Sequence, residues 1–512
     1  MPEYGIIRSC SGSVLSWVCG ASAAYVVMRV REPAWWAETA KRVKGDEDMN
    51  RREFIGMSGA TFAIASAKTL FGAAVPSKKL RLCVIGCART ANHGNGFVVD
   101  PKGWRGRGFQ VMSRFAELPN CVVTVLCDVD STALDYAAAE LKAKTGVAPA
   151  KVKDFREAVR RDDVDAVLVA TPDHSHCYIG AEAMKAGKAL YLEKPIGISA
   201  GEAEILAAVQ RKTGAVFQLG TQRRSSYATQ QAVAYIRSGK IGQPHWAKAW
   251  CLSDRPAIRG VKSAPIPAWM GADGWDLWQC CAPRRAYRSQ IVHYNWRFFR
   301  GYGTGDLPNN GLHFIDIARW ALGAEWPERV YAGGGHLFCE GEDWEWDDTH
   351  MLTVQFPGKK YLAWEGCSHT GAMPFMGKWT GCLVYCDDGV AFFGPLGESA
   401  IYDRTGKKVI REWAAADSGD QEGDKRLSDP IRACDIWHVQ RFTDCALAGD
   451  RDTAQPIDAS LKSNLLTELG NVSLQIGEAV HIDPATGKLK DPNGPAAKLW
   501  MPQYEPGWEL KA

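Results

Sequence analysis

The sequence predicts an α/β protein in two parts: a doubly wound parallel sheet, and then an α/β domain built on an open, mainly antiparallel sheet. From Leu80 to Leu219, short apolar runs alternate with helical patterns across short loops, which is typical of a doubly wound sheet. After Pro244, strand patterns dominate and turn signals such as Pro357-Gly358 separate them. A chain of 512 residues with 46% hydrophobic content is long enough to give each part its own core.

The overall charge argues against a highly charged partner. The 61 basic and 58 acidic residues give a formal net charge of +3, which is too small to gather nucleic acid or an anionic membrane. We therefore expect a small neutral ligand and no nucleic-acid partner. Cysteines such as Cys83 and Cys121 fall in or beside predicted strands, so we expect no disulfide framework. Cys382 and Cys386 have no second ligand pair at a suitable spacing, so no metal site is predicted.

The N-terminal region is expected to lie outside the fold. The run Arg51-Arg52-Glu53-Phe54-Ile55 and the apolar stretch 56–75 resemble a twin-arginine export signal. Such signals are read at a free N-terminus. We therefore expect translation to start at Met49, so that 1–48 is a mis-called extension produced by a start codon assigned too early, and 49–79 is the signal and linker. This predicts a periplasmic or otherwise exported protein whose mature form is not inserted in a membrane. The alternative is that Ser11 to Met28 forms a marginal anchor.

A phosphate-binding turn is predicted where the first parallel strand ends. Leu80 to Ile85 reads as a buried strand followed by Gly86, but the expected G-x-G-x-x-G pattern does not continue. Gly106 and Gly108 come only after a segment from about Ala88 to Trp104, and a helix pattern follows them. We therefore predict an insertion within the turn, with the three glycines binding the pyrophosphate of a dinucleotide. The alternative is that these glycines serve only turns.

An acidic residue follows the next strand. Val122 to Leu126 reads as a strand, and Asp128 comes 20 residues after Gly108, the usual distance from the glycine turn to the acid that binds the ribose hydroxyls. An acid there favours NAD, because it accepts a hydrogen bond from the 2′-hydroxyl and repels a 2′-phosphate. We therefore predict NAD as the cofactor, with NADP less favoured.

The most informative stretch is a β-α-β unit whose strand ends carry polar side chains. Strands Val164 to Thr171 and Ala189 to Leu192 flank the helix Tyr178 to Gly187, and they end in Thr171-Pro172-Asp173-His174-Ser175-His176 and Glu193-Lys194-Pro195. Ligands bind beyond the carboxyl ends of parallel strands, so we expect Lys194 to point at the ligand. The alternation continues with helices Phe155–Arg160 and Gly201–Thr213 and strand Ala215–Leu219.

The second part is expected to close with helices around its sheet. The predicted strands are His350–Phe356, Lys360–Cys367, Gly381–Cys386, Val390–Phe393 and Ser399–Tyr402. The predicted helices are Asn309–Leu322, Trp437–Ala448 and Ala459–Val480. Between Ser253 and Tyr302, a segment rich in Pro, Arg and Trp has no clear periodicity and is too long for an ordinary connection. We expect it to form part of the substrate wall.

Together these motifs resemble the Gfo/Idh/MocA family of glucose-fructose oxidoreductases and inositol dehydrogenases. The resemblance runs from about residue 80 to 512 and rests on Asp128, Thr171–His176, Glu193–Pro195, Gly220–Arg224 and Gly311–Asp316. It implies an NAD-binding Rossmann domain over 80–222 and a C-terminal substrate and oligomerisation domain over 223–512, hence a homo-oligomer. It also implies that Lys194 faces the nicotinamide and substrate, and that the Thr-Pro loop and the glutamine region lie along the cofactor.

The motifs and the resemblance define a candidate site. Cofactor contacts are expected from Gly86, Gly106, Gly108, Asp128, Thr171, Pro172, His176, Glu193, Lys194 and Gln222. Catalytic roles are expected for Lys194, His313 and Asn309. In relatives the position four before this histidine is usually an aspartate, and a neutral amide cannot accept a proton, so proton transfer must rest on Lys194 or His313. A lone histidine on a helix is more often structural than catalytic, and it is the resemblance that favours a functional role for His313.

These features predict an NAD-dependent oxidoreductase that transfers a hydride between nicotinamide and a ring hydroxyl of a carbohydrate: a sugar, polyol or glycoside. Lys194, partly desolvated beside a cationic nicotinamide, would serve as the base, since its ammonium form is disfavoured there. Two alternatives stay open. One is redox-neutral glycoside cleavage or lyase chemistry through transient ring oxidation, with the cofactor retained. The other is a non-catalytic NAD and sugar sensor, against which the retention of Lys194 and His313 argues.

Overall fold

The computed structural model describes most of the chain from residue 78 onward. The described residues are 78–92, 97–103, 105–415, 417 and 429–512, with four short strands near the N-terminus: β1 (Leu15–Trp17), β2 (Gly20–Ala21), β3 (Ala24–Tyr25) and β4 (Met28–Val30). The predicted twin-arginine stretch lies outside them. Residues 1–75 and 76–512 form two compact units. Among the described residues, no helix has the length and apolar character needed to cross a membrane.

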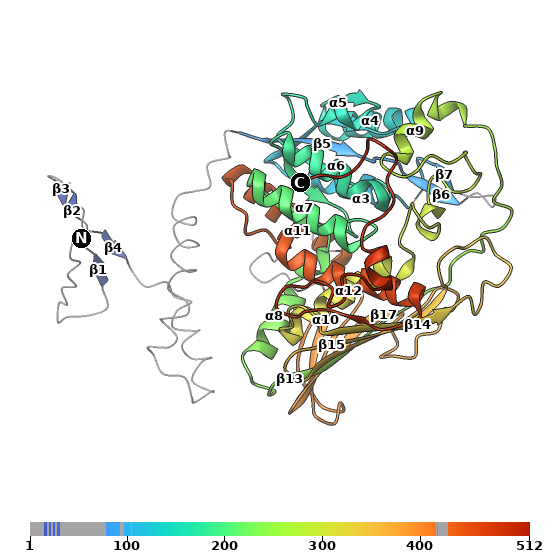
Figure 1. The fold of residues 1–512 in the computed structure, drawn as a ribbon. Helices are drawn as coiled ribbons and strands as arrows, with labels where there is room; N and C mark the ends of the chain where they lie inside the picture. The colour runs from blue at the N-terminus through green and yellow to red at the C-terminus, as the bar shows by residue number, and fades with distance from the viewer. Residues whose placement is uncertain are drawn as a thin grey trace. The chain divides into compact units, whose positions relative to one another are not determined.

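The first layer of the larger unit is a six-stranded parallel sheet, as predicted (Figure 1). Its strands, in spatial order, are β12 (Phe217–Leu219), β11 (Ala189–Leu192), β10 (Ala166–Val169), β5 (Leu80–Ile85), β8 (Cys121–Cys127) and β9 (Ala150–Val152). These strands are almost wholly apolar and buried, as expected for a parallel sheet with helices on both faces. The connecting helices are α3 (Arg107–Phe115), α4 (Ser131–Thr145), α5 (Phe155–Ala158), α6 (Asp173–Lys185) and α7 (Ala200–Thr213).

Two of these helices differ from the sequence expectation. Helix α6 begins at Asp173, five residues before the predicted start, because Pro172 occupies the N-cap position and an acidic residue in the first turn is favoured by the helix dipole. Most of the Thr-Pro motif is therefore helical. Helix α4 was not predicted, although Asp130 caps it by accepting hydrogen bonds from the amides of Thr132 and Ala133.

The second layer is a nine-stranded sheet with helices on one face. Its strands, in spatial order, are β20 (Val409–Trp413), β19 (Ser399–Asp403), β18 (Gly389–Phe393), β17 (Thr380–Cys386), β13 (Pro244–Leu252), β16 (Lys360–Cys367), β15 (Thr349–Phe356), β14 (Arg329–Gly335) and β21 (Val480–His481). The prediction of an open, mainly antiparallel sheet is confirmed, but β13 runs parallel to β16, so the strands do not form a simple meander. Helices α8 (Tyr227–Arg237), α10 (Leu312–Leu322) and α12 (Ile457–Ile476) cover its buried face.

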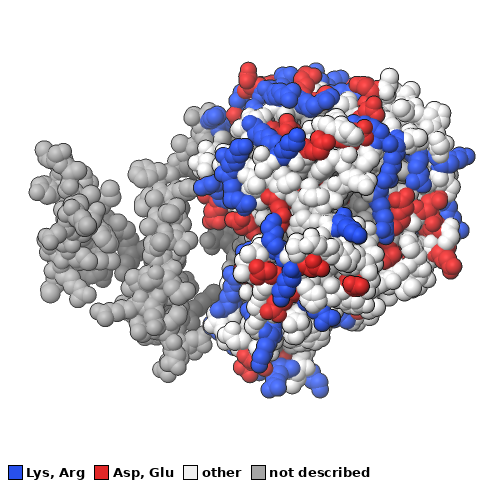
Figure 2. Space-filling model, in the orientation of Figure 1, with Lys and Arg blue, Asp and Glu red and all other residues white. Residues whose placement is uncertain are grey.

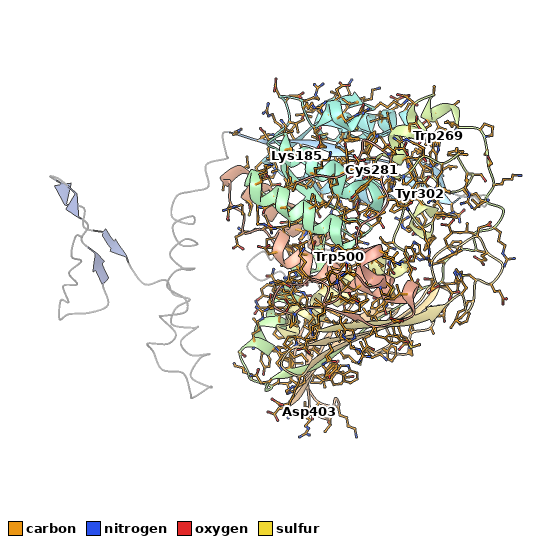
Figure 3. All side chains as sticks on the ribbon, in the orientation of Figure 1. Lys185, Trp269, Cys281, Tyr302, Asp403 and Trp500 are labelled. Carbon is orange, nitrogen blue, oxygen red and sulfur yellow. The ribbon has the colours of Figure 1, made fainter. Side chains whose placement is uncertain are left out.

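The two parts of the sequence share cores, so packing does not follow the expected boundary after residue 222. Helix α11 (Pro430–Ala448) packs on α3 and β5, and its Val439 and Phe442 join the core that contains Phe115. It begins seven residues before the predicted start because Asp429 caps its first turn. The C-terminal tail also returns: the Gly201 amide donates to the Trp500 carbonyl, and Figure 3 shows Trp500 between the two layers.

Candidate functional site

A cavity of about 420 Å³ lies at the carboxyl ends of β5, β8, β10 and β11. Its wall includes every residue that the sequence analysis expected to bind cofactor or to catalyse: Gly86, Gly106, Gly108, Asp128, Thr171, Pro172, His176, Glu193, Lys194, Gln222, Asn309 and His313. Residues from the 253–302 segment complete the wall: Trp269, Leu277, Trp278, Val292, His293, Tyr294, Trp296 and Arg297. The fold therefore gathers the predicted groups around one space.

The interrupted glycine turn is continuous in space. The insertion forms a hairpin of β6 (Thr90–Asn92) and β7 (Phe97–Val99), closed at its base where the backbones of Thr90 and Arg105 pair. Helix α3 then starts beside Gly86. A Cβ atom added at Gly108 would lie 1.8 Å from the Gly86 carbonyl oxygen, so only glycine fits that contact. The first turn of α3 thus faces the cavity, as a pyrophosphate site requires.

Asp128 connects the second strand end to this turn. Its Oδ2 accepts a hydrogen bond from the Cys87 amide at 2.9 Å, and its Oδ1 accepts one from the Asp130 amide at 3.0 Å. Burial, together with the nearby Asp130 carboxylate, raises the pKa of Asp128 above its ordinary value. Each oxygen has a further acceptor position, so the carboxylate can also bind a ribose hydroxyl.

The 253–302 segment is fastened over the Asp128 end of the cavity. His293 Nε2 lies 2.6 Å from Asp130 Oδ2, and the His293 ring stacks on Trp269 with centroids 4.7 Å apart. The Ser131 hydroxyl donates to the Trp269 carbonyl at 3.2 Å. Figure 3 shows Trp269 and Tyr302 alongside the parallel-sheet layer. The segment therefore walls the nucleotide end of the cavity as well as the end near Lys194, which the sequence did not predict.

Lys194 is held by neutral acceptors. Its Nζ donates to the backbone carbonyl of Asn309 and, at 3.0 Å, to Asn309 Oδ1. The Asn309 amide in turn donates to Asp306 Oδ1 at 3.0 Å. Burial lowers the pKa of Lys194 to about 8, against the opposing effect of the Glu193 and Asp173 carboxylates. The ammonium is thus destabilised enough to exchange a proton near neutral pH.

The helix that carries Asn309 starts differently from the prediction. Residues Leu307–Gly311 form a π-helical turn, and the α-helix α10 begins only at Leu312. Pro308 has no amide hydrogen to donate in this turn, and π turns are frequent at functional sites. This turn carries Asn309 against Lys194, while His313 lies one turn further along.

His313 and Gln222 present unpaired polar atoms. His313 Nδ1 and Gln222 Oε1 are buried without a hydrogen-bond partner among the described residues. Burial, with the nearby Lys194 and Arg223 charges, lowers the pKa of His313 well below its ordinary value, so its imidazole is neutral. A neutral imidazole can hydrogen-bond a hydroxyl, but its low pKa makes it a weaker base than Lys194.

Glu193 is occupied by a partner that the sequence analysis missed. The Arg107 side chain donates to Glu193 Oε1 at 2.9 Å and binds Asp435 through two bonds of 2.9 and 2.7 Å. These partners lie 86 and 328 residues from Arg107 in the chain. Glu193 therefore orients the strand end, and its lysine neighbour points into the cavity.

His176 joins the two strand ends of the β-α-β unit. Its Nδ1 lies 2.7 Å from the Pro195 carbonyl and its Nε2 lies 2.8 Å from the Thr171 carbonyl. Its neighbour Asp173, also missed as a site residue, accepts hydrogen bonds from the amide and hydroxyl of Thr304. Burial raises the pKa of Asp173 above its ordinary value. Both residues therefore fix the cavity wall.

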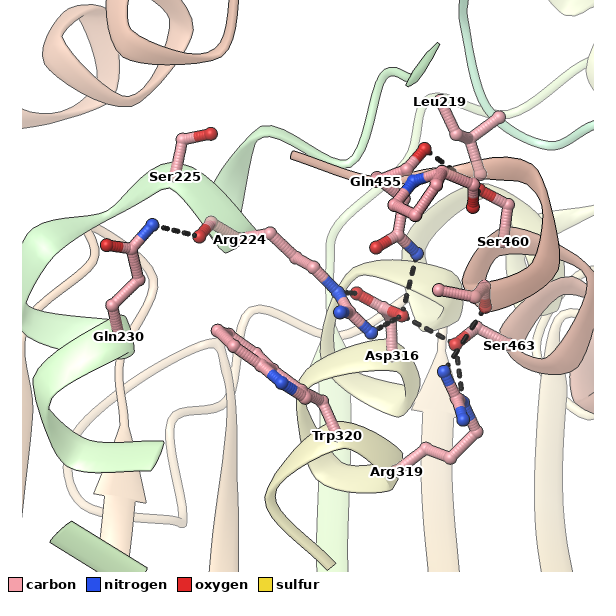
Figure 4. Close-up of polar contacts among 12 residues, drawn as sticks. Leu219, Arg224, Ser225, Gln230, Asp316, Arg319, Trp320, Gln455, Ser460 and Ser463 are labelled. Atoms are coloured by element: carbon pink, nitrogen blue, oxygen red, sulfur yellow. Dashed lines mark hydrogen bonds and ion pairs between the residues drawn. The ribbon is translucent and has the colours of Figure 1, made fainter. Parts of the chain in front are cut away.

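Asp316 belongs to a separate, closed cluster (Figure 4). Its carboxylate binds Arg224 through bonds of 2.7 and 2.9 Å and accepts further bonds from Gln455 and Ser463. Although Asp316 lies three residues after His313 on α10, it does not line the cavity. The motif residues of this helix therefore divide between the cavity and a structural core.

A candidate metal-ligand group lies away from the cavity wall. His336, Cys339 and Asp348 place their ligand atoms within 4.8 Å of one another. Asp348 already accepts hydrogen bonds from the Phe338 and Cys339 amides and from the Thr349 hydroxyl. The loop itself explains this grouping, and we assign no metal to it. Every cysteine of the described part is a free thiol.

The fold and site together define a dinucleotide-binding α/β protein. The Gly86–Gly108 contact leaves a backbone-lined cradle, and Asp128 and Gln222 offer acceptors, so the residues present fit NAD. The family described as "Oxidoreductase family, NAD-binding Rossmann fold" (Gfo/Idh/MocA) matches residues 80–221. This part of the chain is therefore an NAD-binding Rossmann domain, and it is similar to that of the Gfo/Idh/MocA family.

Individual relatives extend this likeness. The chain is 25% identical over 219 residues to the 2,7-anhydro-N-acetylneuraminate hydratase of Mediterraneibacter gnavus, covering 42% of this chain and 49% of the relative. It is 32% identical over 181 residues to a glycosyl hydrolase family 109 protein of Saccharopolyspora erythraea, covering 33% and 39%. The matched regions span 58% or less of the curated relatives' lengths.

Solved structures show the same fold over a longer range. A levoglucosan dehydrogenase in complex with NADH and levoglucosan superposes with a TM-score of 0.58 at 17% identity, covering 79% of this chain and 99% of the other. At this identity the likeness establishes the fold. It confirms the predicted pairing of a Rossmann sheet with a C-terminal, mainly antiparallel sheet.

Proposed function

We propose that this protein is an NAD-dependent oxidoreductase that transfers a hydride between the nicotinamide and a ring hydroxyl of a sugar, polyol or glycoside. The observation that carries this proposal is the placement of Lys194. It ends strand β11 inside the cavity, is held by Asn309, and has its pKa lowered to about 8. A dehydrogenase needs such a base, because a proton leaves the hydroxyl as the hydride leaves its carbon.

Each residue around Lys194 has a separate role in this chemistry. NAD, when bound, supplies the hydride acceptor. The neutral His313 imidazole hydrogen-bonds and orients the substrate hydroxyl, and uncharged Lys194 takes the hydroxyl proton at Nζ. Asn309 receives the Nζ hydrogen bonds in both charge states, and Asp306 fixes the Asn309 amide. A cationic nicotinamide nearby further disfavours the lysine ammonium before reaction.

Redox-neutral chemistry is a second candidate with its own support. Here a ring carbon is oxidised transiently, a substituent is eliminated, and the hydride returns. The His293–Asp130 contact and the Ser131–Trp269 hydrogen bond fasten the 253–302 segment over the nucleotide end, which favours a retained cofactor. Two of the relatives have names that denote hydratase or glycosyl hydrolase activity.

One experiment separates the candidates. Purified protein with NAD is incubated with a panel of sugars, polyols and aryl glycosides, and NADH absorbance and released aglycone are followed together. Stoichiometric NADH without aglycone supports the dehydrogenase. Aglycone release without net NADH supports redox-neutral cleavage. NAD and sugar binding without either product would contradict both and support the non-catalytic sensor.

We also propose that the protein is exported by the twin-arginine route and assembles as a homo-oligomer. Arg51-Arg52 and the apolar stretch after it support export. The solvent face of the nine-stranded sheet supports assembly, since it exposes Trp246, Tyr331, Met351 and Tyr361. Mass spectrometry of the exported chain and light scattering of the purified protein test these two proposals; peptides from 1–48 in the mature protein, or a monomer, would contradict them.

A further inference from the structure

One arginine in the cavity wall has a fixed side chain and forms no ion pair with a described residue. Arg297, in the short 3₁₀ helix η3 (Asn295–Phe298), lines the cavity together with Lys194. Its guanidinium lies 4.0 Å from the centroid of the Tyr294 ring and 4.4 Å from that of Trp296. These cation–π contacts hold the orientation of the guanidinium plane. Burial lowers the pKa of Arg297, which nevertheless remains a cation at neutral pH.

The other arginine of the cavity wall is different. Arg107 is neutralised by Glu193 and Asp435. Within the described part of the chain, Arg297 forms no ion pair, and its side chain donates to the backbone carbonyl of Tyr294. Because a guanidinium has five N–H donors, Arg297 retains donors for a ligand.

The two acidic groups that act electrostatically on Arg297 form their hydrogen bonds with other residues. Asp306 binds Arg255 through bonds of 3.1 and 2.9 Å and accepts a bond from Ser368. Asp173 accepts from the amide and hydroxyl of Thr304. Arg297 lowers the pKa of Lys194, after burial, whereas Asp173 raises it, so both charged groups act on the space beside Lys194. No carboxylate of the described residues therefore occupies the Arg297 donors, although the Asp173 carboxylate lies in the same cavity wall and acts on Arg297.

We infer that the substrate carries a carboxylate, as a uronic acid does, and that Arg297 binds it bidentately while a ring hydroxyl lies at Lys194. This inference rests on the proposed function and narrows its substrate class. The chain's net charge of +3 favoured a neutral ligand. Inside a low-dielectric cavity, however, the nearest charged groups with free hydrogen-bond donors decide which ligand binds, and Figure 2 shows both signs interspersed on the outer surface.

Matched substrate pairs test the inference. Aryl glucuronide with aryl glucoside, and aryl galacturonide with aryl galactoside, differ chiefly in the carboxylate. Their kcat/KM for NADH formation and aglycone release, and their affinity for the NAD-loaded protein by calorimetry, are compared in the unmodified protein, Arg297→Met and Arg297→Lys. Arg285→Met is the matched control, because Arg285 is an exposed arginine of the same segment outside the cavity wall.

We expect the unmodified protein to prefer at least one carboxylated partner by about 10- to 100-fold, the range of a charge-assisted hydrogen bond. Arg297→Met abolishes that preference without changing NAD affinity, Arg297→Lys restores part of it, and Arg285→Met keeps it. If neutral partners turn over as well as acids, or if Arg297→Met lowers NAD affinity and leaves the preference intact, the inference is overturned while the proposed function stands. If no compound is turned over, the proposed function fails and the inference fails with it.

Discussion

The short helical stretch from Leu307 to Leu322 contributes residues to two buried polar clusters, which differ in the partners of their charged groups. In the closed cluster, Asp316 is paired with Arg224, and Gln455 and Ser463 satisfy the remaining carboxylate positions. In the open cluster, Lys194 has neutral acceptors only, and His313 Nδ1 has no partner in the described part. A buried charge with all its bonds made holds a fold together. A buried charge held by neutral acceptors is suited to chemistry on a ligand.

Breaking the closed cluster tests whether its ion pair stabilises the fold, and this change should have the largest effect. Arg224→Met leaves the Asp316 carboxylate buried without its cation, which typically costs about 3 to 5 kcal/mol of unfolding free energy. Urea denaturation measures this loss. Arg441→Met, which removes an exposed ion pair with Asp450, is the control and should cost less than about 1 kcal/mol. Equal losses for the two variants would show that the closed cluster does not stabilise the fold.

Adding a charge to the open cluster tests whether the pKa of Lys194 controls hydride transfer. Asn309→Asp places a carboxylate against Lys194 Nζ and replaces the amide that donates to Asp306. The Glu193 and Asp173 carboxylates and the Arg297 and Arg107 cations also act on Lys194. An opposite charge at that distance raises a lysine pKa by about 1 unit or more. Because the base must be uncharged, the rate of hydride transfer should rise with pH through about 8 in the unmodified protein and at a higher pH in the variant.

The measurement is the pH profile of single-turnover NAD reduction. At pH 7 the variant should be slower by about tenfold for every pH unit by which the inflection of its profile lies above that of the unmodified protein. Asn310→Asp, at a neighbouring position outside the cavity wall, should leave the profile in place. A profile with no inflection near 8, or one that Asn309→Asp does not move, would remove Lys194 from the role of base.

A smaller effect is expected from a substitution of Asp128, at the nucleotide end of the cavity. Asp128→Ala removes the acceptor for the ribose hydroxyl and the repulsion of a 2′-phosphate, so the preference for NAD over NADP should narrow by about tenfold. Calorimetry with both nucleotides measures this preference. Asp135→Ala, which removes an exposed carboxylate, is the control and should leave the preference unchanged. Tighter binding of NADP by the unmodified protein would contradict the placing of Asp128 at the ribose.

Much of the fold followed from local patterns. The runs Leu80–Ile85 and Ala189–Leu192 were predicted as buried strands, and Leu352, Val354 and Phe356 alternate as one buried face of a sheet. The interrupted glycine turn was recognisable because Gly106 and Gly108 keep the spacing to Asp128 that an intact turn would have.

The rest of the site depends on contacts between distant parts of the chain. Arg107 meets Asp435 across 328 residues, and no local pattern shows that pairing. Arg297 lies in a segment held by aromatic packing, without the periodicity that identifies a helix or strand. The motif residue Asp173 was visible in the sequence, but its hydrogen bonds to Thr304 appear only in the fold.

The most direct test of the account is single-turnover reduction of bound NAD by Lys194→Met at saturating substrate, with a thermal melt of the same sample. Methionine keeps most of the side-chain length and loses the proton-transfer group. We predict a loss of about 10²- to 10⁴-fold in hydride transfer, with NAD affinity and melting temperature unchanged. Turnover within about threefold of the unmodified protein, accompanied by earlier melting, would show that Lys194 only stabilises its loop and would make His313 the residue to test.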